Sequence, residues 1–513
     1  MENKCYDINL AYKMNMMFLG MYDVLVWAKS KKWIKRLSQI VTIIALTLLA
    51  IRVYDSQKGE PLELWHTVHL NELASKQIEN ANWDDYLLAE QALFDELKQK
   101  VTDQLTKDKR QLLNRYAINS PTNPDNFKTN WNRSFILKPD HKPLGAVVLL
   151  HGLTDSPYSL RHIALYYQKK GFVVVAIRMP AHGTTPSALV SVKWEDWLAA
   201  TYLAVRTASS YIEKEQPLHI VGYSNGSALA LMYTLDSIDN SALAKPDQVI
   251  LISPMIGVTS FARFAGLAGL PAIFPPFAKA AWVNIIPEYN PFKYNSFPIN
   301  GARQSYELTV ALQKKVVSLE KQKLTKLPSI LTFLSVVDST VNTRSAIEFY
   351  NLLPSHHHEL VVFDVNRNVK LGPLLKDKAY YAIEDLLPKL PRNYETIVVT
   401  NRSPDSKEAV AYITKAQQIK ATEEALNTAY PSDLYSLSHI ALPFPVTDSL
   451  YGEKPMLLNE FGISIGALAI RGEREVLVTS LDNLLRASYN PFYSFLIQQI
   501  DQRVEATLNK KIQ

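Results

Sequence analysis

From Ser134 onward the sequence repeats one pattern, in which short apolar runs rich in β-branched residues alternate with segments of helical periodicity. Near-continuous apolar strands of this kind are typical of parallel sheets that helices cover on both faces. The sequence therefore predicts an α/β fold with a mostly parallel sheet. Reactive side chains are expected at the carboxyl ends of its strands. The predicted strands are Ala146–Leu150, Phe172–Ile177, Leu218–Val221, Gln248–Ile252, Ile330–Val337, Glu359–Phe363 and Glu395–Thr400.

The segment G-Y-S-N-G, Gly222–Gly226, joins the strand Leu218–Val221 to a helical stretch. A G-x-S-x-G segment in this setting is typical of a nucleophile elbow, in which a tight turn projects the serine hydroxyl from the sheet edge. The glycines let strand and helix pass closely. We therefore predict Ser224 as a nucleophile, the alternative being a structural turn serine. The amide of Asn225, at a helix N-terminus, is predicted to stabilise an oxyanion.

A second loop at the same sheet edge, H-G-L-T-D-S-P, follows the strand Ala146–Leu150. In this topology it lies beside the elbow, so we expect the amide of Leu153 to be the second oxyanion donor. His151 precedes the nucleophile on a different strand. We expect it to hold the loop by hydrogen bonding and not to act as the base.

The acid that orients a catalytic histidine is expected after a later strand. Asp338 follows the run Ile330–Val337 and is the predicted acid, whereas Asp364, after Glu359–Phe363, is its rival.

His439 is the predicted base, because it lies in a loop beyond the last predicted strand and gives the chain order serine, aspartate, histidine. An unusually long segment separates it from Asp338, including Lys407–Asn427, which is predicted to be helical. The run His356–His358 precedes a strand, and adjacent side chains on an extended chain alternate faces. It is therefore predicted as a solvated loop and not as a metal site.

An insertion at about 256–328 separates two of the predicted strands. Apolar and aromatic residues dominate its middle, and prolines break it into short pieces. Above the strand ends it would form a lid over Ser224 that binds acyl chains and excludes water. The alternative is that these residues only pack on the core.

Four motifs in this order resemble the α/β-hydrolase fold. They are H-G-L-T-D-S at His151–Ser156, P-A-H-G-T at Pro180–Thr184, the elbow, and the D-S-T-V that begins at Asp338. Within that fold they are most similar to monoacylglycerol lipase and lysophospholipase-like serine hydrolases, which also resemble serine aminopeptidases. The resemblance covers about residues 134–450.

The resemblance implies Ser224 as nucleophile, Asp338 as acid and His439 as base, with no metal and no organic cofactor. Ser227 departs from the family pattern, because it stands where a third glycine is frequent. The first 130 residues lie outside the resemblance.

The net charge of +6 is concentrated near the N-terminus. Residues 1–36 carry seven Lys and Arg against three Asp and Glu, and Arg52 adds one more positive charge, which leaves about +1 for residues 53–513. This distribution is unlike a nucleic-acid-binding face, so no nucleic-acid partner is predicted. The only cysteine is Cys5, which excludes an intramolecular disulfide framework and a cysteine-based zinc site.

The basic cluster flanks the uncharged run Leu37–Ile51. Flanking aromatic and apolar residues extend this run to a transmembrane signal anchor at 33–54, close to the roughly 20 residues that a span needs. The positive flank predicts a cytoplasmic N-terminus and an extracytoplasmic body. A cleaved signal peptide and a buried soluble helix are the alternatives.

The predicted organisation is a basic tail at 1–32, the anchor at 33–54, a linker and amphipathic helical region at 55–133, and an α/β-hydrolase domain at 134–513. The predicted function is a membrane-anchored serine hydrolase that cleaves carboxylic esters, with a monoacylglycerol or lysophospholipid type of substrate. An acyltransferase, an aminopeptidase-type peptidase and a catalytically silent binding module are the alternatives. The sequence leaves the oligomeric state open.

Overall fold

The computed structural model describes residues 31–55, 57–105, 113–257, 269–354, 356–370, 374–468 and 481–512. It divides the chain into two compact units, Met1–Gly59 with Leu270–Ala280, and Glu60–Gly269 with Ala281–Gln513. The predicted basic tail lies almost wholly outside the described residues, as does the part of the predicted lid at 258–268.

The larger unit is built on a ten-stranded sheet of order β1-β3-β2-β4-β5-β8-β9-β10-β11-β12. Neighbouring strands from β3 through β10 pair in parallel, whereas β1, β11 and β12 pair antiparallel at the two edges. The predicted mostly parallel sheet is thus confirmed. The strands are β1 (Phe135–Leu137), β2 (Gly145–Leu150), β3 (Phe172–Ile177), β4 (Leu218–Tyr223), β5 (Gln248–Ile252), β8 (Ser329–Ser335), β9 (Glu359–Phe363), β10 (Glu395–Asn401), β11 (Glu408–Thr414) and β12 (Thr422–Ala429).

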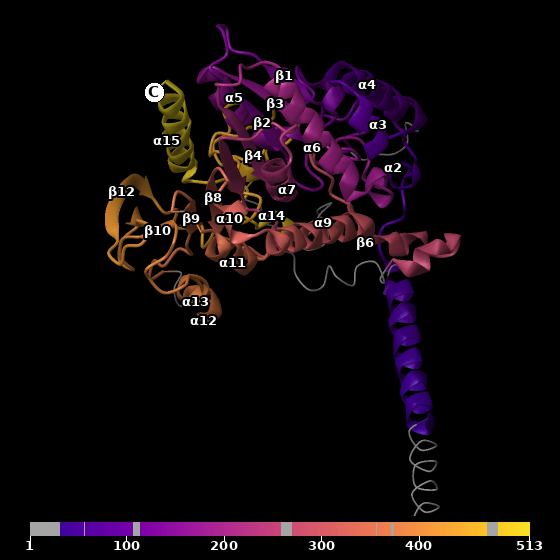
Figure 1. The fold of residues 1–513 in the computed structure, drawn as a ribbon. Helices are drawn as coiled ribbons and strands as arrows, with labels where there is room; N and C mark the ends of the chain where they lie inside the picture. The colour runs from indigo at the N-terminus through magenta and orange to yellow at the C-terminus, as the bar shows by residue number, and fades with distance from the viewer. Residues whose placement is uncertain are drawn as a thin grey trace, which may run out of the picture. The chain divides into compact units, whose positions relative to one another are not determined.

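Helices cover both faces of this sheet (Figure 1). In β2, Val147 and Leu149 belong to one apolar cluster, and Ala146 and Val148 belong to the other, because successive strand residues point to opposite faces. Burial on both faces explains why β2, β3, β5 and β9 have no polar residues between their apolar ones. The Val148 face is covered by α6 (Trp194–Ser209), α7 (Asn225–Asp239), α9 (Ile299–Ser318) and α11 (Thr343–Leu352), and the Val147 face by α5 (Arg161–Lys169) and α15 (Tyr493–Ile512).

The segment Lys407–Asn427, predicted to be helical, forms strands β11 and β12 instead. In β11, Ala409–Ala411 are buried beside β10. β12 has the sequence T-E-E-A-L-N-T-A, whose composition favours a helix, but it is the exposed edge strand of the sheet. The helical prediction was wrong because hydrogen bonding to β11 outweighs local propensity.

The structure also differs from the predicted linker at the start of the body. This region holds α2 (Leu64–Thr67), α3 (Ser75–Asn80) and α4 (Trp83–Lys100), and Trp65 and Ile78 are buried. The predicted amphipathic helix begins at an Asn82 cap, whose side chain accepts the amide of Asp85, and it ends at Lys100. Residues 60–105 therefore belong to the same compact unit as the sheet.

A buried ion-pair network fixes α4 and the chain before it to the sheet. The Arg178 guanidinium, which follows β3, lies 3.1 Å from a carboxylate oxygen of Glu72 and 3.1 Å from one of Glu90. Tyr86 donates a hydrogen bond of 2.6 Å to the Arg178 carbonyl. Glu90 also accepts the Ser134 hydroxyl at 2.7 Å.

The smaller unit contains a helix, Lys31–Asp55, that is long and apolar enough to cross a membrane. Its most apolar window has a mean hydropathy of 1.9, and none of that window is buried. This exposure does not fit the alternative of a buried soluble helix. An anchor and a signal peptide both remain predictions.

The insertion after β5 and the late part of the chain contain the remaining short elements. The insertion forms the two-stranded pair β6–β7 before α9. The short elements are β6 (Trp282–Asn284), β7 (Phe297–Pro298), α10 (Lys321–Leu324), α12 (Asp377–Tyr380), α13 (Ala382–Leu386) and α14 (Leu481–Leu484).

Candidate active site

Ser224 occupies the turn between β4 and α7, where the sequence predicts an elbow. Its φ is 53°, a left-handed conformation that costs energy in a residue with a side chain. The backbone holds this strain, because the Ser224 amide donates to the carbonyl of Ile252 on β5 at 2.9 Å and the Ser224 carbonyl accepts the amide of Met255 at 3.2 Å. The turn therefore presents the serine side chain at the carboxyl edge of the sheet.

Two glycines make this turn possible. A Cβ on Gly226 would lie 2.0 Å from the carbonyl oxygen of Leu150 on β2, and one on Gly222 would lie 2.5 Å from the Gly226 carbonyl oxygen. Ser227, which departs from the family pattern, donates its hydroxyl to the Gly222 carbonyl at 2.7 Å. The helix therefore starts in contact with the strands on both sides of the nucleophile position.

Asp338 and His439 meet despite their separation in sequence. His439 Nδ1 lies 2.8 Å from Asp338 Oδ2, and the amides of Thr340 and Val341 donate to Asp338 Oδ1 at 2.8 and 3.0 Å. Burial alone would raise the pKa of Asp338, but His439 and these hydrogen bonds outweigh it and hold the pKa below its usual value. The carboxylate is thus ionised and fixed against the imidazole.

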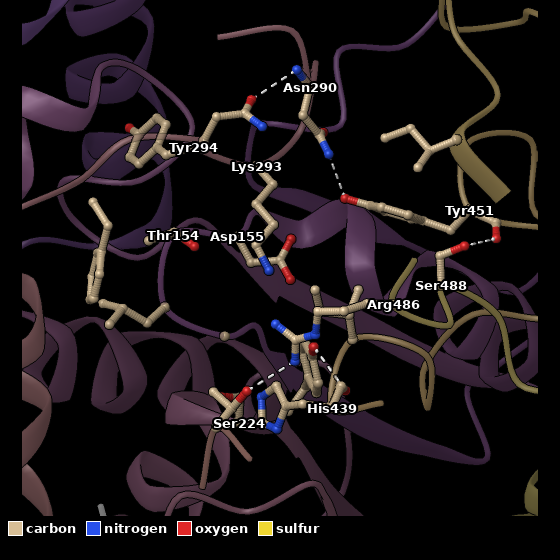
Figure 2. Close-up of a pocket in the computed structure, with 18 of the residues that line it drawn as sticks. Thr154, Asp155, Ser224, Asn290, Lys293, Tyr294, His439, Tyr451, Arg486 and Ser488 are labelled. Atoms are coloured by element: carbon tan, nitrogen blue, oxygen red, sulfur yellow. Dashed lines mark hydrogen bonds between the residues drawn. The ribbon is translucent and has the colours of Figure 1, made fainter. Parts of the chain in front are cut away.

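Ser224 and His439 line one pocket of about 360 Å³. Figure 2 shows the two side chains next to one another at one end of that pocket. The rival acid, Asp364, is elsewhere: its carboxylate pairs with Arg367 at 2.5 Å. The structure therefore brings together the three residues that the sequence predicts as nucleophile, base and acid.

The two predicted oxyanion donors follow β2 and the nucleophile position, respectively. Leu153 lines the pocket, and Asn225 is the first residue of α7, where an amide has no partner within the helix. Within the described part of the chain, neither amide donates a hydrogen bond to another residue.

His151 fixes the loop after β2. Its Nε2 accepts the amide of Met179 at 3.0 Å, and its Nδ1 lies 2.9 Å from the Gly152 carbonyl oxygen. Burial holds the pKa of His151 well below its usual value, so the ring is neutral. These contacts are those of a positioning residue.

The histidine run differs in part from the predicted solvated loop. His356 is exposed, but His358 is buried and accepts the amide of Ile330 on β8. Burial lowers the pKa of His358 to about 3. Among the described residues, no group of three or more His, Cys, Asp or Glu side chains is arranged to hold a metal ion.

Among the described residues, the part of the insertion that lines the pocket does not present the apolar surface expected for a lid. Polar and aromatic side chains from the stretch around β6 and β7 predominate, among them Asn284, Tyr289, Asn290, Lys293 and Asn295.

Asp155, Tyr451 and Arg486 also line the pocket, and Arg486 lies beside His439 in Figure 2. Sequence reasoning missed these three residues and Lys293, because all four belong to loops without periodicity. The only available signal was the carboxyl of Asp155 within a motif already singled out.

Part of the chain matches a known protein family. The model of the family described as serine aminopeptidase, S33, matches residues 141–367. A thermostable monoacylglycerol lipase from Bacillus sp. (strain H-257) is 31% identical over 93 residues, which are 18% of this chain and 35% of that enzyme. The chain thus spans about a third of the length of the curated relative that it matches.

Several solved structures are similar to part of this chain. A structure reported with the metagenome-derived lipolytic enzymes LipS and LipT is 18% identical, with a TM-score of 0.37, and the match covers 46% of this chain and 88% of that one. A soluble variant of monoglyceride lipase from Saccharomyces cerevisiae is 15% identical, with a TM-score of 0.35, covering 45% and 81%. The predicted α/β-hydrolase resemblance is confirmed over residues 141–367 by the family match and the sheet topology.

Proposed function

We propose that this α/β-hydrolase, whose residues 141–367 match the model of the family described as serine aminopeptidase, S33, hydrolyses carboxylic esters through an acyl-enzyme on Ser224. The observation that carries the proposal is the 2.8 Å contact between His439 and an ionised Asp338, beside a serine in a strained turn. An aspartate in this position fixes the imidazole tautomer and stabilises the imidazolium that forms during catalysis.

In the proposed reaction, His439 accepts the hydroxyl proton of Ser224 as Oγ attacks the ester carbonyl. The amides of Leu153 and Asn225 stabilise the resulting oxyanion. His439 then donates its proton to the leaving alcohol, and the acyl group stays on Ser224. Water, activated by the same histidine, attacks the acyl-enzyme and releases the carboxylic acid.

A fluorophosphonate probe tests this proposal, because it labels only an activated serine. The wild-type chain is expected to label and Ser224→Ala to remain unlabelled, while His439→Ala loses both labelling and ester turnover. The circular dichroism spectrum of each variant controls for folding. A folded wild-type chain that does not label, or a Ser224→Ala variant that labels equally, would contradict the proposal.

The proposed location is a membrane, with the helix Lys31–Asp55 as anchor, the N-terminus cytoplasmic and the body extracytoplasmic. The basic side chains before the apolar run support this orientation. An apolar tip of the insertion, Leu270–Ala280, belongs to the same compact unit as the helix. Lys279 Nζ donates to the Gly59 carbonyl at 2.8 Å, and the Gln57 amide donates to the Pro276 carbonyl at 3.3 Å.

This tip exposes large apolar side chains beside the end of the helix. Ile273 is 73% exposed and Phe274 is 63% exposed. Exposed apolar side chains next to an anchor suit the lipid interface, where they lose their contact with water.

A fluorophore on an introduced cysteine tests the contact of the tip with lipid. In a Cys5→Ser background, the label on Ile273→Cys is expected to shift to shorter wavelength when the chain moves from detergent into vesicles. Ile419→Cys, which is also 73% exposed, is the matched control and is expected not to shift. Equal emission changes at the two sites would refute the contact.

A further inference from the structure

The pocket that contains Ser224 carries more positive than negative charge. Among its described lining residues, Lys293 and Arg486 are cations and Asp155 is the one carboxylate. They enter the pocket from three separate parts of the chain, and Figure 2 shows all three side chains in its interior. A pocket for a wholly neutral ester has no need of two cations.

Hydrogen bonds of the neighbouring residues fix the backbone at Lys293, but its side chain has no hydrogen-bond or ion-pair partner among the described residues. The Tyr294 amide donates to the Thr154 carbonyl at 2.8 Å, and the Phe292 amide donates to Asn290 Oδ1 at 3.0 Å, so the backbone on both sides is fixed. The side chain extends toward Asp155 (Figure 2). No hydrogen bond or ion pair joins its ammonium group to any described residue.

Asp155 does not neutralise this lysine with a close contact. Burial raises the pKa of Asp155 to about 6, although Lys293 and the Ser156 amide act against the rise. The Asp155 carboxylate accepts that amide at 3.0 Å. Burial also lowers the pKa of Lys293, and the positive charge of Arg486 adds to that effect, whereas Asp155 opposes it.

Arg486 contributes a second cation, most of whose N–H donors are available to a ligand. One of its terminal nitrogens donates to Thr340 Oγ1 at 3.2 Å, which is the one hydrogen bond of its guanidinium to the described residues. A guanidinium has five N–H donors in a planar fork that matches the oxygens of carboxylate and phosphate. Thr340 also follows the acid Asp338, so the guanidinium is tied to the catalytic edge of the sheet.

We propose that this pocket selects esters that carry an anionic group, a phosphate or a carboxylate, and that Lys293 and Arg486 bind this group while the ester carbonyl lies at Ser224. The inference rests on the proposed ester hydrolysis and adds a substrate class to it. Burying the Lys293 ammonium group without an anionic partner costs free energy, and a bound anion offsets that cost. A neutral acylglycerol does not offset it.

The first test compares esters that share one acyl chain. They are a 1-acylglycerol, the corresponding 1-acylglycerol 3-phosphate, and the acyl ester of a hydroxycarboxylic acid, each assayed with the full chain in detergent micelles. One or more of the anionic esters is expected to have a kcat/KM about 10- to 100-fold above that of the neutral ester, the range of a hydrogen bond to a charged group. The two anionic arms show whether phosphate or carboxylate is preferred.

Substitutions of Lys293 and Arg486 test whether these two cations cause the preference for anionic esters. Lys293→Met and Arg486→Gln are each expected to lower the ratio of anionic to neutral kcat/KM at least about 10-fold, mainly through KM. Lys293→Arg is expected to keep most of it. Lys326→Met removes an exposed lysine that does not line the pocket, and is expected to leave the ratio unchanged. A ratio near one in the wild-type chain, or a ratio unaffected by Lys293→Met, overturns the proposal.

A binding measurement separates this proposal from the proposed function. Calorimetry with the non-hydrolysable 1-alkyl ethers of glycerol and glycerol 3-phosphate does not depend on Ser224 chemistry. Tighter binding of the phosphate ether, lost in Lys293→Met, supports the anion site even if fluorophosphonate labelling fails. Equal binding of the two ethers in a chain that does label, and that shows no preference for the carboxylate ester in the first test, overturns the anion site alone.

Discussion

Replacement of Arg178 by methionine tests whether residues 60–105 are an integral part of the body. The Arg178 side chain is 4% exposed and that of Glu90 is 3% exposed, so the substitution leaves a carboxylate buried without its cation. Removing one partner of a buried ion pair costs about 3–5 kcal/mol. That is a large part of the roughly 5–15 kcal/mol by which a typical domain is stable.

Urea unfolding of the full chain in detergent, followed by tryptophan fluorescence, measures the free energy of unfolding. Arg178→Met is expected to lower it by about 3–5 kcal/mol without a change in slope. Lys98→Met is the matched control, because Lys98 and Asp103 form an exposed pair, and its expected effect is within about 1 kcal/mol.

The double variant Arg178→Met, Glu90→Gln identifies the source of the loss. If the cost comes from the unpaired carboxylate of Glu90, neutralising it recovers part of the stability, and the two substitutions are not additive. A loss as small as that of Lys98→Met, or a double variant less stable than Arg178→Met alone, would show that the network does not hold residues 60–105 to the sheet.

Three further predictions concern single residues. Burial raises the pKa of Glu288 to about 7, so the stability that its protonated form provides is complete below about pH 4.5 and is lost as pH rises through 7. The free energies of unfolding from urea titrations at pH 5 and pH 8 should therefore differ by about 2–3 kcal/mol, and by much less in Glu288→Gln. Gly226→Ala is expected to abolish folded, probe-labelled protein, whereas Gly59→Ala, where nothing lies within 4 Å of an added Cβ, should behave as wild type. Asp338→Asn should lower kcat about 10⁴-fold with an unchanged melting temperature, and retention of near-normal turnover would exclude it as the acid.

The central strands could be predicted because each is buried on both faces. β3, β5 and β9 begin and end where the apolar runs do. β12 could not be predicted, because its glutamates and alanines favour a helix and only the hydrogen bonds to β11 make it a strand. Edge strands have little burial to mark them in a sequence.

The candidate site likewise contains residues that the sequence could predict and residues that it could not. Ser224, Asp338 and His439 follow predicted strands in a fixed order, so topology was sufficient to predict that they meet. Lys293 and Arg486 are in loops, whose path depends on tertiary contacts such as the hydrogen bond from Tyr294 to Thr154. No pattern of residues in the chain predicts that two such loops face one pocket.

The contact between Asp338 and His439 also has a consequence for the synthesis of the protein. It joins residues 101 positions apart, with β9 to β12 between them. A growing chain that has not reached His439 already holds Ser224, Asp338 and every parallel strand that the structure describes, but it lacks the proposed base. In the proposed mechanism, activity therefore begins only when the late part of the chain has been made and folded onto the sheet, so turnover reports a completed molecule.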